Sequence, residues 1–284
     1  MNDLAPFAEA VGATGAVTIT GLGTRGGPVA DVRCVSAPSG IDWVQPDEMT
    51  MSCGAGTSVH EVNAALAEHG QRVAMPASGT IGGALAVGHS DCRRLGDGPI
   101  RDVLLQTRYV SSAGEVVKAG GPTVKNVSGF DLCRLLVGSC GTLGFLGDVI
   151  VRTRPIASHS QWFSACVPEP YACFTTLYRP ISVLWDGATV WALLEGQAAD
   201  VTEQATSAGL LPCAGPPALP TGSRRVLPPA ELASLTGTFV AEVGVGVVHH
   251  TEPWSTPPGD QRAIDLARAL KCEFDPSGRL NPGV

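Results

Sequence analysis

Glycine is concentrated in three short stretches of this chain, and these stretches restrict the possible folds more than any other feature. They are GLGTRGG at 21–27, PASGTIGGA at 76–84 and GSCGTLG at 138–144. Glycine inside a helix or strand costs about 0.5–1 kcal/mol relative to alanine, so a cluster indicates positive φ or backbone against a ligand. The third stretch lies within KNVSGFDLCRLLVGSCGTLGFLGDVIVR, residues 125–152, which is otherwise largely apolar. We therefore expect a well-packed domain whose glycine loops meet a bound molecule.

The segments around these loops predict one α+β domain of short elements. A capping box at Ser58–Glu61 begins a helix whose Val59, Val62 and Leu66 share one face. Ser112–Gly114 would turn a hairpin between two strands. The other hydrophobic patterns predict helices at 3–12 and 131–137, strands at 16–20, 29–35, 49–53 and 147–153, and hairpin strands at 102–110 and 115–118.

A different pattern begins near Ser160. It predicts a strand, helix, strand, strand, helix and strand at 160–167, 168–178, 181–185, 189–195, 199–208 and 238–248. This β-α-β-β-α-β order is ferredoxin-like, with the proline-rich residues 211–222 as a loop before the last strand. A helix at 259–271 would then lead the chain back. We expect a first domain at 1–157, a small cap domain at 158–250 and a returning segment at 251–284.

A nicotinamide-binding Rossmann fold is the obvious alternative, because Gly21, Gly23 and Gly26 follow a predicted strand in a G-x-G-x-x-G pattern. That fold requires a helix to begin at the third glycine, before the next parallel strand. Gly27 and Pro28 instead lead within a few residues to another predicted strand, which argues against it. The same glycines can still form a nest of backbone N–H groups for a pyrophosphate.

Composition excludes several other classes of protein. The net charge is −7 with no basic run, which argues against nucleic-acid binding. The nine cysteines are odd in number and include no C-x-x-C pair, so reduced thiols are expected rather than disulfides or a metal centre. The first residues do not resemble a secretion signal and no apolar run approaches 18 residues, so we expect a cytoplasmic protein without direct membrane insertion.

The order and spacing of the glycine loops, with the tail FDPSGRLNPG at 274–283, resemble the FAD-binding domain of the vanillyl-alcohol-oxidase type, the PCMH flavoprotein fold. The resemblance implies that the glycines bring bare backbone against FAD, while Leu132, Leu135, Leu136, Leu143 and Phe145 pack the domain. The expected fold is thus a PCMH-type α+β domain with a small ferredoxin-like insertion.

The resemblance also implies which residues contact the cofactor. Covalent members attach FAD through a histidine of the first glycine loop, and residues 21–27 contain none, so FAD is expected to be non-covalent. Asn281 would lie at the edge of the isoalloxazine ring. The expected FAD-binding residues are Gly21, Gly23, Thr24, Arg25, Gly26, Gly27, Pro76, Gly79, Thr80, Gly82, Gly83, Ala84, Gly88, Ser128, Gly129, Gly138, Gly141, Thr142, Gly144, Ile150 and Asn281.

KNVSGFDLCRLLVGSCGTLG and GHSDCRRLGDGPIRD resemble most the FAD-binding subunits of bacterial glycolate oxidases. In that family a larger catalytic flavoprotein subunit and an iron–sulfur subunit complete a complex that oxidises glycolate to glyoxylate. The resemblance implies these partners, a small hydroxy-acid substrate, and peripheral association with the inner membrane through the partners. Two alternatives stay open: a stand-alone FAD oxidase or dehydrogenase of another alcohol or hydroxy acid, and a non-catalytic subunit that only assembles the complex.

Oxidation of a hydroxy acid needs a base for the hydroxyl proton and a cation for the carboxylate. The candidate bases are His89, His249 and His250, although each is also consistent with an ordinary surface or hydrogen-bonded histidine. Arg93 and Arg94 could bind the carboxylate or the FAD phosphates, or could simply be solvated. His60, His69 and His159 are expected at the surface. The short cap and its lack of a histidine cluster favour a chain that depends on partners.

Overall fold

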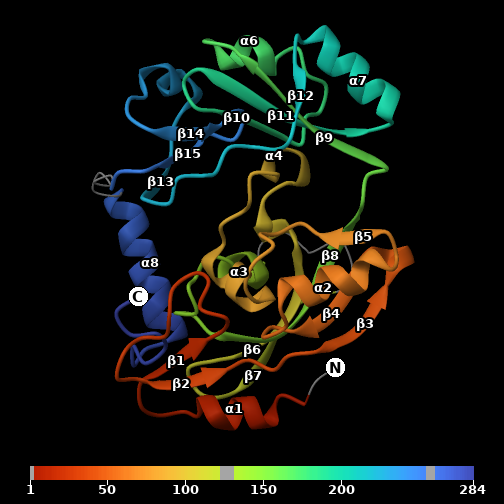
Figure 1. Ribbon diagram of the computed structural model, residues 1–284. Coiled ribbons are helices and arrows are strands. Elements are labelled where there is room, and N and C mark those ends of the chain that lie inside the picture. Colours follow the sequence, from red (N-terminus) through yellow and green to blue (C-terminus); the bar gives the residue numbers. More distant parts are fainter. Residues whose placement is uncertain (1–2, 122–130, 254–259) are drawn as a thin grey trace. The chain divides into compact units, whose positions relative to one another are not determined.

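The computed structural model describes residues 3–121, 131–253 and 260–284, and Figure 1 labels most of its helices and strands. The chain divides into two compact units. Unit 1 comprises Met1–Ser90, Pro99–Ile156 and Asp260–Val284, and unit 2 comprises Asp91–Gly98 and Ala157–Gly259. The segment 91–98, which the sequence analysis placed in the first domain, thus belongs to unit 2.

Unit 1 is a mixed helix and sheet domain. Its larger sheet has the order β3-β4-β8-β6-β7, and β5 pairs with the far end of β8. The strands of this sheet are β3 (Ile41–Gln45), β4 (Thr50–Gly54), β5 (Gln71–Val73), β6 (Leu104–Val110), β7 (Val116–Gly120) and β8 (Phe145–Pro155). The helices of the unit are α1 (Ala5–Val11), η1 (Pro46–Glu48), α2 (Val59–Ala67), α3 (Ile81–Val87), η2 (Ile100–Asp102), α5 (Leu132–Leu136) and α8 (Gln261–Phe274).

Two apolar clusters hold unit 1 together. In the larger, α2 and α3 pack on the sheet, with Val62, Leu66 and Leu85 completely buried against strand residues such as Met51 and Val151. The helix α2 begins as expected, because the Ser58 side chain accepts a hydrogen bond from the Glu61 backbone N–H at 3.0 Å. The smaller cluster joins α1 to a second sheet and to the tail through Phe7, Val11, Val17, Val35, Val110, Phe145 and Leu280.

The second sheet of unit 1 has two strands, β1 (Val17–Thr20) and β2 (Arg33–Ser36), which pair in parallel. The strand expected at 29–35 thus begins later, after a left-handed Asp31 with φ 59°. Residues 21–32 contain no helix, so a Rossmann crossover is absent from this described segment. The tail adds to the sheet, because the Val17 backbone N–H donates to the Arg279 carbonyl at 2.9 Å.

Unit 2 contains one antiparallel sheet of order β12-β9-β11-β10-β14-β15-β13. Its strands are β9 (His159–Cys166), β10 (Ser182–Trp185), β11 (Thr189–Gly196), β12 (Leu211–Cys213), β13 (Ser223–Val226), β14 (Phe239–Glu242) and β15 (Val247–His250). Its helices are α4 (Arg94–Asp97), α6 (Pro170–Phe174), α7 (Ala198–Ser207) and η3 (Pro229–Ser234).

The ferredoxin-like order is present in unit 2, but a different strand completes it. The elements β9, α6, β10, β11, α7 and β12 form the motif, with β9 between β11 and β12. Its last strand is therefore β12 at 211–213, inside the stretch expected to be a loop. The strand expected at 238–248 is a hairpin of β14 and β15, because Gly244 and Gly246 adopt positive φ between them. This hairpin and β13 extend the sheet beside β10.

Candidate functional site: a glycine-lined cavity in unit 1

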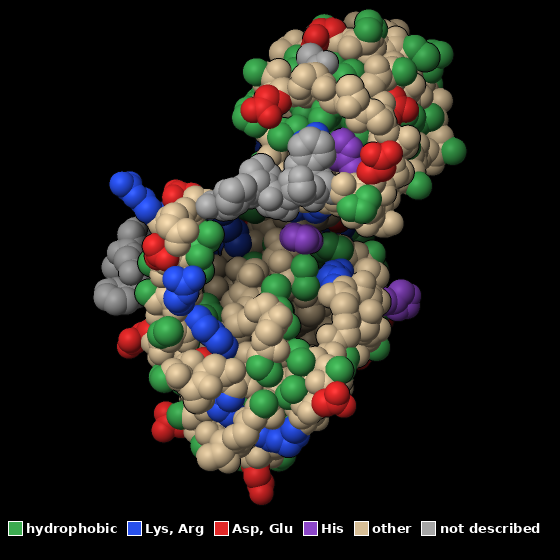
Figure 2. Space-filling model, turned by 90° about the vertical axis from the view of Figure 1, so that its left-hand side faces the viewer, with side chains coloured by type: hydrophobic (Ala, Val, Ile, Leu, Met, Phe, Trp, Pro, Cys, Tyr) green, Lys and Arg blue, Asp and Glu red, His purple; other side chains and the backbone are tan. Residues whose placement is uncertain are grey.

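The glycine loops come together around a cavity of about 200 Å³ in unit 1. Its wall combines β1, the first glycine loop at 21–27, the beginning of α3, the third glycine loop at 138–144 and the tail. On the face of unit 1 that Figure 2 shows, backbone and hydrophobic atoms surround a hollow. Backbone rather than charged side chains therefore dominates the cavity wall.

The first glycine loop presents bare backbone to open space. Gly23 and Gly26 adopt φ of 68° and 102°, which favour glycine. A Cβ atom added at Gly23, Gly26 or Gly27 would have no heavy atom within 4 Å. Packing within the described chain therefore does not exclude a side chain at these three positions. A ligand that lies against the backbone would exclude one.

Arg25 is the cation of this cavity. Its Nη2 atom is buried and has no hydrogen-bond partner within the described residues, and burial lowers the pKa of its guanidinium. The guanidinium lies against Gly79 of the second glycine loop, where a Cβ atom would collide with Arg25 Nη1 and Thr24 Oγ1. A partly buried guanidinium with an unused donor is suited to an anionic group such as a phosphate.

The second glycine loop ends in the helix α3 rather than remaining a loop. The Thr80 side chain caps this helix and accepts a hydrogen bond from the Gly83 backbone N–H at 3.0 Å. The Gly82 N–H donates to the Ala55 carbonyl at 2.7 Å, and a Cβ atom at Gly82 would be 2.8 Å from that oxygen. Gly82 thus allows α3 to pack closely beside the end of β4.

The third glycine loop is held by hydrogen bonds from several directions. The N–H groups of Gly138 and Cys140 donate to carbonyls of α3, Leu85 at 3.0 Å and Ala86 at 2.8 Å. The tail contributes as well, because Asn281 Nδ2 donates to the Cys140 carbonyl at 2.7 Å. This loop therefore has a fixed backbone at the cavity wall.

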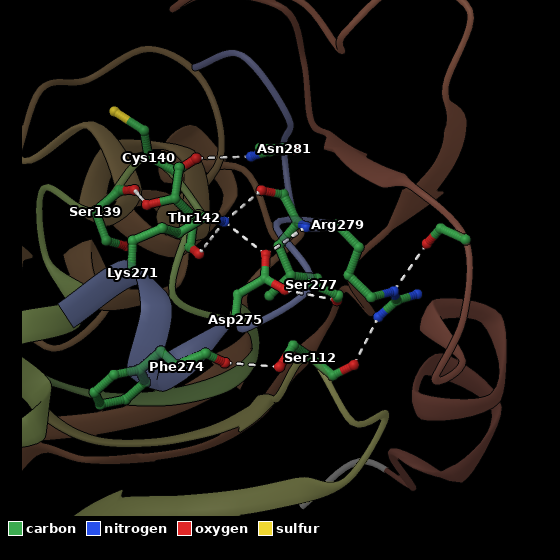
Figure 3. A network of polar contacts seen from close by, with 12 residues as sticks. Ser112, Ser139, Cys140, Thr142, Lys271, Phe274, Asp275, Ser277, Arg279 and Asn281 are labelled. Carbon is green, nitrogen blue, oxygen red and sulfur yellow. Dashed lines mark hydrogen bonds and ion pairs between the residues drawn. The ribbon is translucent and has the colours of Figure 1, made fainter. Parts of the chain in front are cut away.

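Figure 3 shows how the tail is connected to the third glycine loop. Lys271 Nζ of α8 donates to the Thr142 carbonyl at 2.8 Å, to the Leu280 carbonyl at 3.0 Å and to Asp275 Oδ2 at 2.6 Å. Burial alone would raise the pKa of Asp275, but hydrogen bonds from Lys271 and from the backbone N–H groups of Leu280 and Arg279 lower it overall. One ammonium group thus joins the helix, the loop and the tail.

Comparison with known proteins identifies the family. A model described as FAD binding domain matches residues 11–120, and a model described as FAD linked oxidases, C-terminal domain, matches residues 228–284. The chain thus carries an FAD-binding domain and the C-terminal domain of FAD-linked oxidases. FAD is therefore its cofactor, which confirms the prediction from the glycine loops.

Solved structures agree on the fold. Two structures of alkyldihydroxyacetonephosphate synthase align with TM-scores of 0.72 and 0.67, at 14% and 15% sequence identity. The first alignment covers 99% of this chain and 74% of the synthase, and the second covers 94% and 71%. At this identity the likeness shows the fold alone, and it confirms the expected α+β PCMH-type class.

Curated relatives match part of the chain. Glycolate oxidase subunit GlcE of Escherichia coli is 38% identical over 134 residues, which are 45% of this chain and 37% of that protein. A D-lactate dehydrogenase of Archaeoglobus fulgidus is 33% identical over 117 residues, which are 39% of this chain and 26% of the enzyme. Glycolate oxidase subunit GlcD of Bacillus subtilis is 40% identical over 76 residues, 27% of this chain and 16% of GlcD. The chain therefore spans well under half the length of these relatives.

The cavity fits an FAD-linked oxidase in its chemistry. Glycine backbone beside Arg25 can receive a pyrophosphate, and the apolar Val87, Leu136 and Leu146 offer contacts for flat rings. The expected FAD-binding residues that line the cavity are Gly21, Gly23, Thr24, Arg25, Gly26, Gly27, Thr80, Gly82, Gly83, Gly141, Gly144 and Asn281.

Other expected FAD-binding residues lie away from the cavity wall. Ala84 is completely buried in the core and Ile150 of β8 is 6% exposed, so the structure places both in the interior. A Cβ atom at Gly88 would be 2.8 Å from Gly138 Cα, which makes Gly88 a contact between α3 and the third loop. The remaining residues away from the lining are Pro76, Gly79, Gly138 and Thr142, and Ser128 and Gly129 lie outside the described residues.

Sequence reasoning missed several lining residues: Thr18, Ile19, Thr20, Leu22, Val29, Ala37, Ala55, Gly56, Ala86, Val87, Leu136, Ser139, Cys140, Phe145, Leu146 and Val284. One of them had a usable signal. Gly54 ends the buried strand β4 and Gly56 follows two residues later, and both glycines approach the backbone of residues 37–39 too closely for a side chain. This short glycine pair indicated a crowded turn, as the longer loops did.

None of the three candidate bases lines the cavity of unit 1. His89 is exposed and follows α3. His249 and His250 belong to β15 of unit 2, where His249 Nε2 lies 2.8 Å from Glu242 Oε1. His250 is buried beside Phe239, and burial lowers the pKa of its ring.

The paired arginines differ in their surroundings. Arg93 is bound to Glu195 at 2.7 Å and to Asp97 at 3.1 Å, all within unit 2. Its guanidinium is therefore already neutralised, which makes it a poor carboxylate anchor. Arg94 lies in electrostatic contact with Arg224 of β13.

In the described ranges, no helix has both the length and the apolar character needed to cross a membrane.

Proposed function

We propose that this chain is the FAD-binding subunit of a complex that oxidises a 2-hydroxy acid, glycolate, to glyoxylate, and that passes its electrons to an iron–sulfur partner. The observation that carries the proposal is the cavity in which glycine backbone surrounds the unused donor of Arg25. The matches to GlcE and GlcD, which are glycolate oxidase subunits, support the substrate class and the existence of partner subunits.

The chain's own residues would bind and orient the cofactor. Arg25 and the backbone of the first loop would bind the pyrophosphate, because a cation and adjacent N–H groups neutralise its charge. The third loop, held by Asn281 and Lys271, would fix the other side of the cavity. FAD, when bound, supplies the hydride acceptor that oxidation of an alcohol requires. The chain lacks any C-x-x-C pair, so electron transfer onward would need a partner.

The mode of FAD attachment is tested by acid precipitation. Residues 21–27 contain no histidine, and no histidine lines the described cavity. We therefore expect acid to release the yellow cofactor into the supernatant. Yellow colour in the pellet, or a purified chain that binds no flavin when FAD is added, would contradict this part of the proposal.

The dependence on partners is tested by reconstitution. The chain alone and the chain with a large flavoprotein subunit and an iron–sulfur subunit are assayed with glycolate, D-lactate and a dye acceptor. We expect oxidation of glycolate by the reconstituted set and little by the lone chain. Equal rates would favour a stand-alone oxidase, for which the similarity to a D-lactate dehydrogenase is the specific observation. Oxidation by the set that survives loss of FAD from this chain would favour a non-catalytic assembly subunit.

A further inference from the structure

One side of the helix α8 is exposed along most of its length. The helix belongs to unit 1 (Figure 1), and no residue of α8, all of which the structure describes, is buried. Phe274 packs against the larger apolar cluster, and Lys271 donates to the Thr142 carbonyl. Residues 261–269 are all exposed, and Leu266 among them is 61% exposed. The helix is therefore anchored near its carboxyl end and bare along the rest.

A single stripe of side chains follows the outer side of α8. It consists of Arg262, Leu266, Ala269 and Glu273, at spacings of four, three and four residues. Because an α-helix has about 3.6 residues per turn, residues at these spacings lie one above another on one face. Successive residues are turned by about 100° around the axis, so this face is directed away from the anchored side. The outer stripe thus presents a cation, a leucine, an alanine and an anion in that order.

The two charges of the outer stripe are unpaired within the described part of the chain. There, neither the Arg262 guanidinium nor the Glu273 carboxylate makes a hydrogen bond or an ion pair. On another side of the same helix, Arg268 is bound to Asp265 at 3.1 Å, and Gln261 Nε2 donates to Asp265 Oδ1 at 2.9 Å. The charges of that side are therefore paired within the helix, and those of the outer stripe are not.

The order of the unpaired charges is the reverse of what a helix alone favours. The helix dipole makes the amino-terminal end partly positive and the carboxyl-terminal end partly negative, so acidic residues stabilise the first turn and basic residues the last. Arg262 is the second residue of α8, and Glu273 is the last but one. Both charges are therefore unfavourably placed in an isolated helix. They become favourable beside an antiparallel helix, whose ends have the opposite polarity.

A second copy of α8 meets this requirement by symmetry. A two-fold axis through the midpoint of the outer stripe makes the two helices antiparallel. Arg262 and Glu273 are equally far from that midpoint, so each Arg262 faces the Glu273 of the second copy. Leu266 and Ala269 are also equally far from it, so a large side chain meets a small one twice. The outer stripe is therefore self-complementary in charge and in size, as an interface across a two-fold axis requires.

We propose that the outer stripe of α8 is a docking surface for a second copy of this chain, and that two copies associate reversibly through it. The proposal concerns self-assembly and goes beyond the proposed function. One helix stripe buries much less than the roughly 800 Å² per partner of a standard stable complex. The dimer is therefore weak, with a dissociation constant on the order of 10 µM.

The larger flavoprotein subunit of the proposed complex is the competing occupant of this surface. Such a subunit could cover Leu266 as well. It would, however, need an anion beside Arg262 and a cation beside Glu273 at the matching distance, whereas a second copy carries both by symmetry. The charge pattern thus favours the second copy, and binding of the other subunit is an outcome of the test.

The test is sedimentation equilibrium of the full chain saturated with FAD, from about 1 µM to about 200 µM, which brackets the expected dissociation constant. Leu266→Asp should raise the dissociation constant at least about tenfold, because it buries an unpaired charge in each copy. Arg262→Glu should raise it about tenfold, because like charges then meet at both ends of the interface. Adding Glu273→Arg to Arg262→Glu should restore it to within about threefold of the wild-type value, since the exchange recreates both ion pairs.

Arg268→Glu is the matched control, because it makes the same change of charge as Arg262→Glu on another side of α8. It should leave association unchanged. FAD binding and far-UV circular dichroism check that each variant is folded, and recovery in the double variant shows that the single change did not act by unfolding the helix.

Three results would overturn the proposal: a chain that stays monomeric throughout, a dimer that survives Leu266→Asp, or a double variant that associates no better than Arg262→Glu. A fourth is a monomeric chain whose binding to the larger flavoprotein subunit is lost in Leu266→Asp, because the outer stripe would then belong to that partner. None of these results bears on oxidation of glycolate by the reconstituted complex, so the proposed function is judged separately.

Discussion

The first and third glycine loops of unit 1 have similar composition but very different packing. In the first, at 21–27, added Cβ atoms at three glycines would meet nothing within 4 Å. In the third, at 138–144, a Cβ atom at Gly144 would be 2.5 Å from the ring of Tyr109, and one at Gly141 would be 2.7 Å from Asn281 Nδ2. Packing within the chain therefore excludes a side chain at Gly141 and Gly144 of the third loop, whereas Cβ positions at Gly23, Gly26 and Gly27 of the first loop face open space.

The two loops also differ in what holds them. The third loop donates hydrogen bonds to carbonyls of α3 and accepts hydrogen bonds from α8 and the tail. In the first loop, the recorded side-chain contact of Arg25 is with its neighbour Thr24 at 3.4 Å. We infer that changes around the third loop reduce stability with or without FAD, and that changes in the first act mainly on FAD affinity.

The largest expected effect on stability is that of Lys271→Met. It leaves the buried Asp275 without its cation, and removing one partner of a buried ion pair costs about 3–5 kcal/mol. Urea unfolding of the FAD-free chain measures the loss. Arg268→Met, on the same helix with an exposed ion pair to Asp265, is the control and should change the unfolding free energy by less than about 1 kcal/mol. Equal losses in both variants would mean that the tail does not hold the third loop.

Gly144→Ala should have the next largest effect. The new methyl group would meet the buried ring of Tyr109, and overpacking of this kind costs about 1–3 kcal/mol. The loss should be the same with and without saturating FAD, once the cofactor's own stabilisation is subtracted. A variant of normal stability that has lost FAD affinity would remove the distinction between the two loops.

The effect of Lys271→Met should depend on pH. The pKa of Asp275 is lowered in the folded chain, so its stabilisation is present above the unfolded pKa and is lost as the pH falls through the folded value. The difference in unfolding free energy between wild type and Lys271→Met should therefore narrow below about pH 4. Urea titrations from pH 6 to pH 2 check this. A difference that stays constant across the range would show that the Asp275 charge contributes nothing.

Gly27→Ala should have the smallest effect on stability but should clearly weaken the affinity for FAD. Its φ is not in the left-handed region and its Cβ position is open, so the unfolding free energy should change by less than about 0.5 kcal/mol. The methyl group would nevertheless enter the cavity, and FAD affinity measured by flavin fluorescence should fall by about tenfold, or about 1.4 kcal/mol. Gly215→Ala is the control, since that position is also open and does not line the cavity. Unchanged FAD affinity in Gly27→Ala would contradict the role given to the first loop.

The glycine loops and the family could be predicted from sequence because their signal is local. The seven neighbouring residues GLGTRGG are enough to indicate a glycine loop, and the four residues of the Ser58 capping box are enough to indicate the beginning of a helix. Elements whose partners are distant were harder. The strand β12 was hidden in the proline-rich loop, because its three residues are strand only through pairing with β9.

The candidate site shows the same limit. Ala84 and Ile150 occur among the expected FAD-binding residues in the sequence, but their side chains point into the core. The pairing of His249 with Glu242 could not be anticipated, because it depends on a hairpin that the sequence pattern presented as one strand. Likewise, only the three-dimensional structure shows that Lys271 reaches Thr142.

The link between β1 and the tail has a consequence for the order of events during biosynthesis. Ile19 and Asn281, which are joined by a hydrogen bond at the cavity, lie 262 residues apart in the chain. At about 5–20 residues per second, a ribosome needs roughly 13–52 s to make the second after the first. During that interval β1 and the third loop lack the tail residues that fix them, so a nascent chain has no complete flavin cavity. We therefore expect FAD to bind only after the residues from Lys271 to Asn281 have left the ribosome.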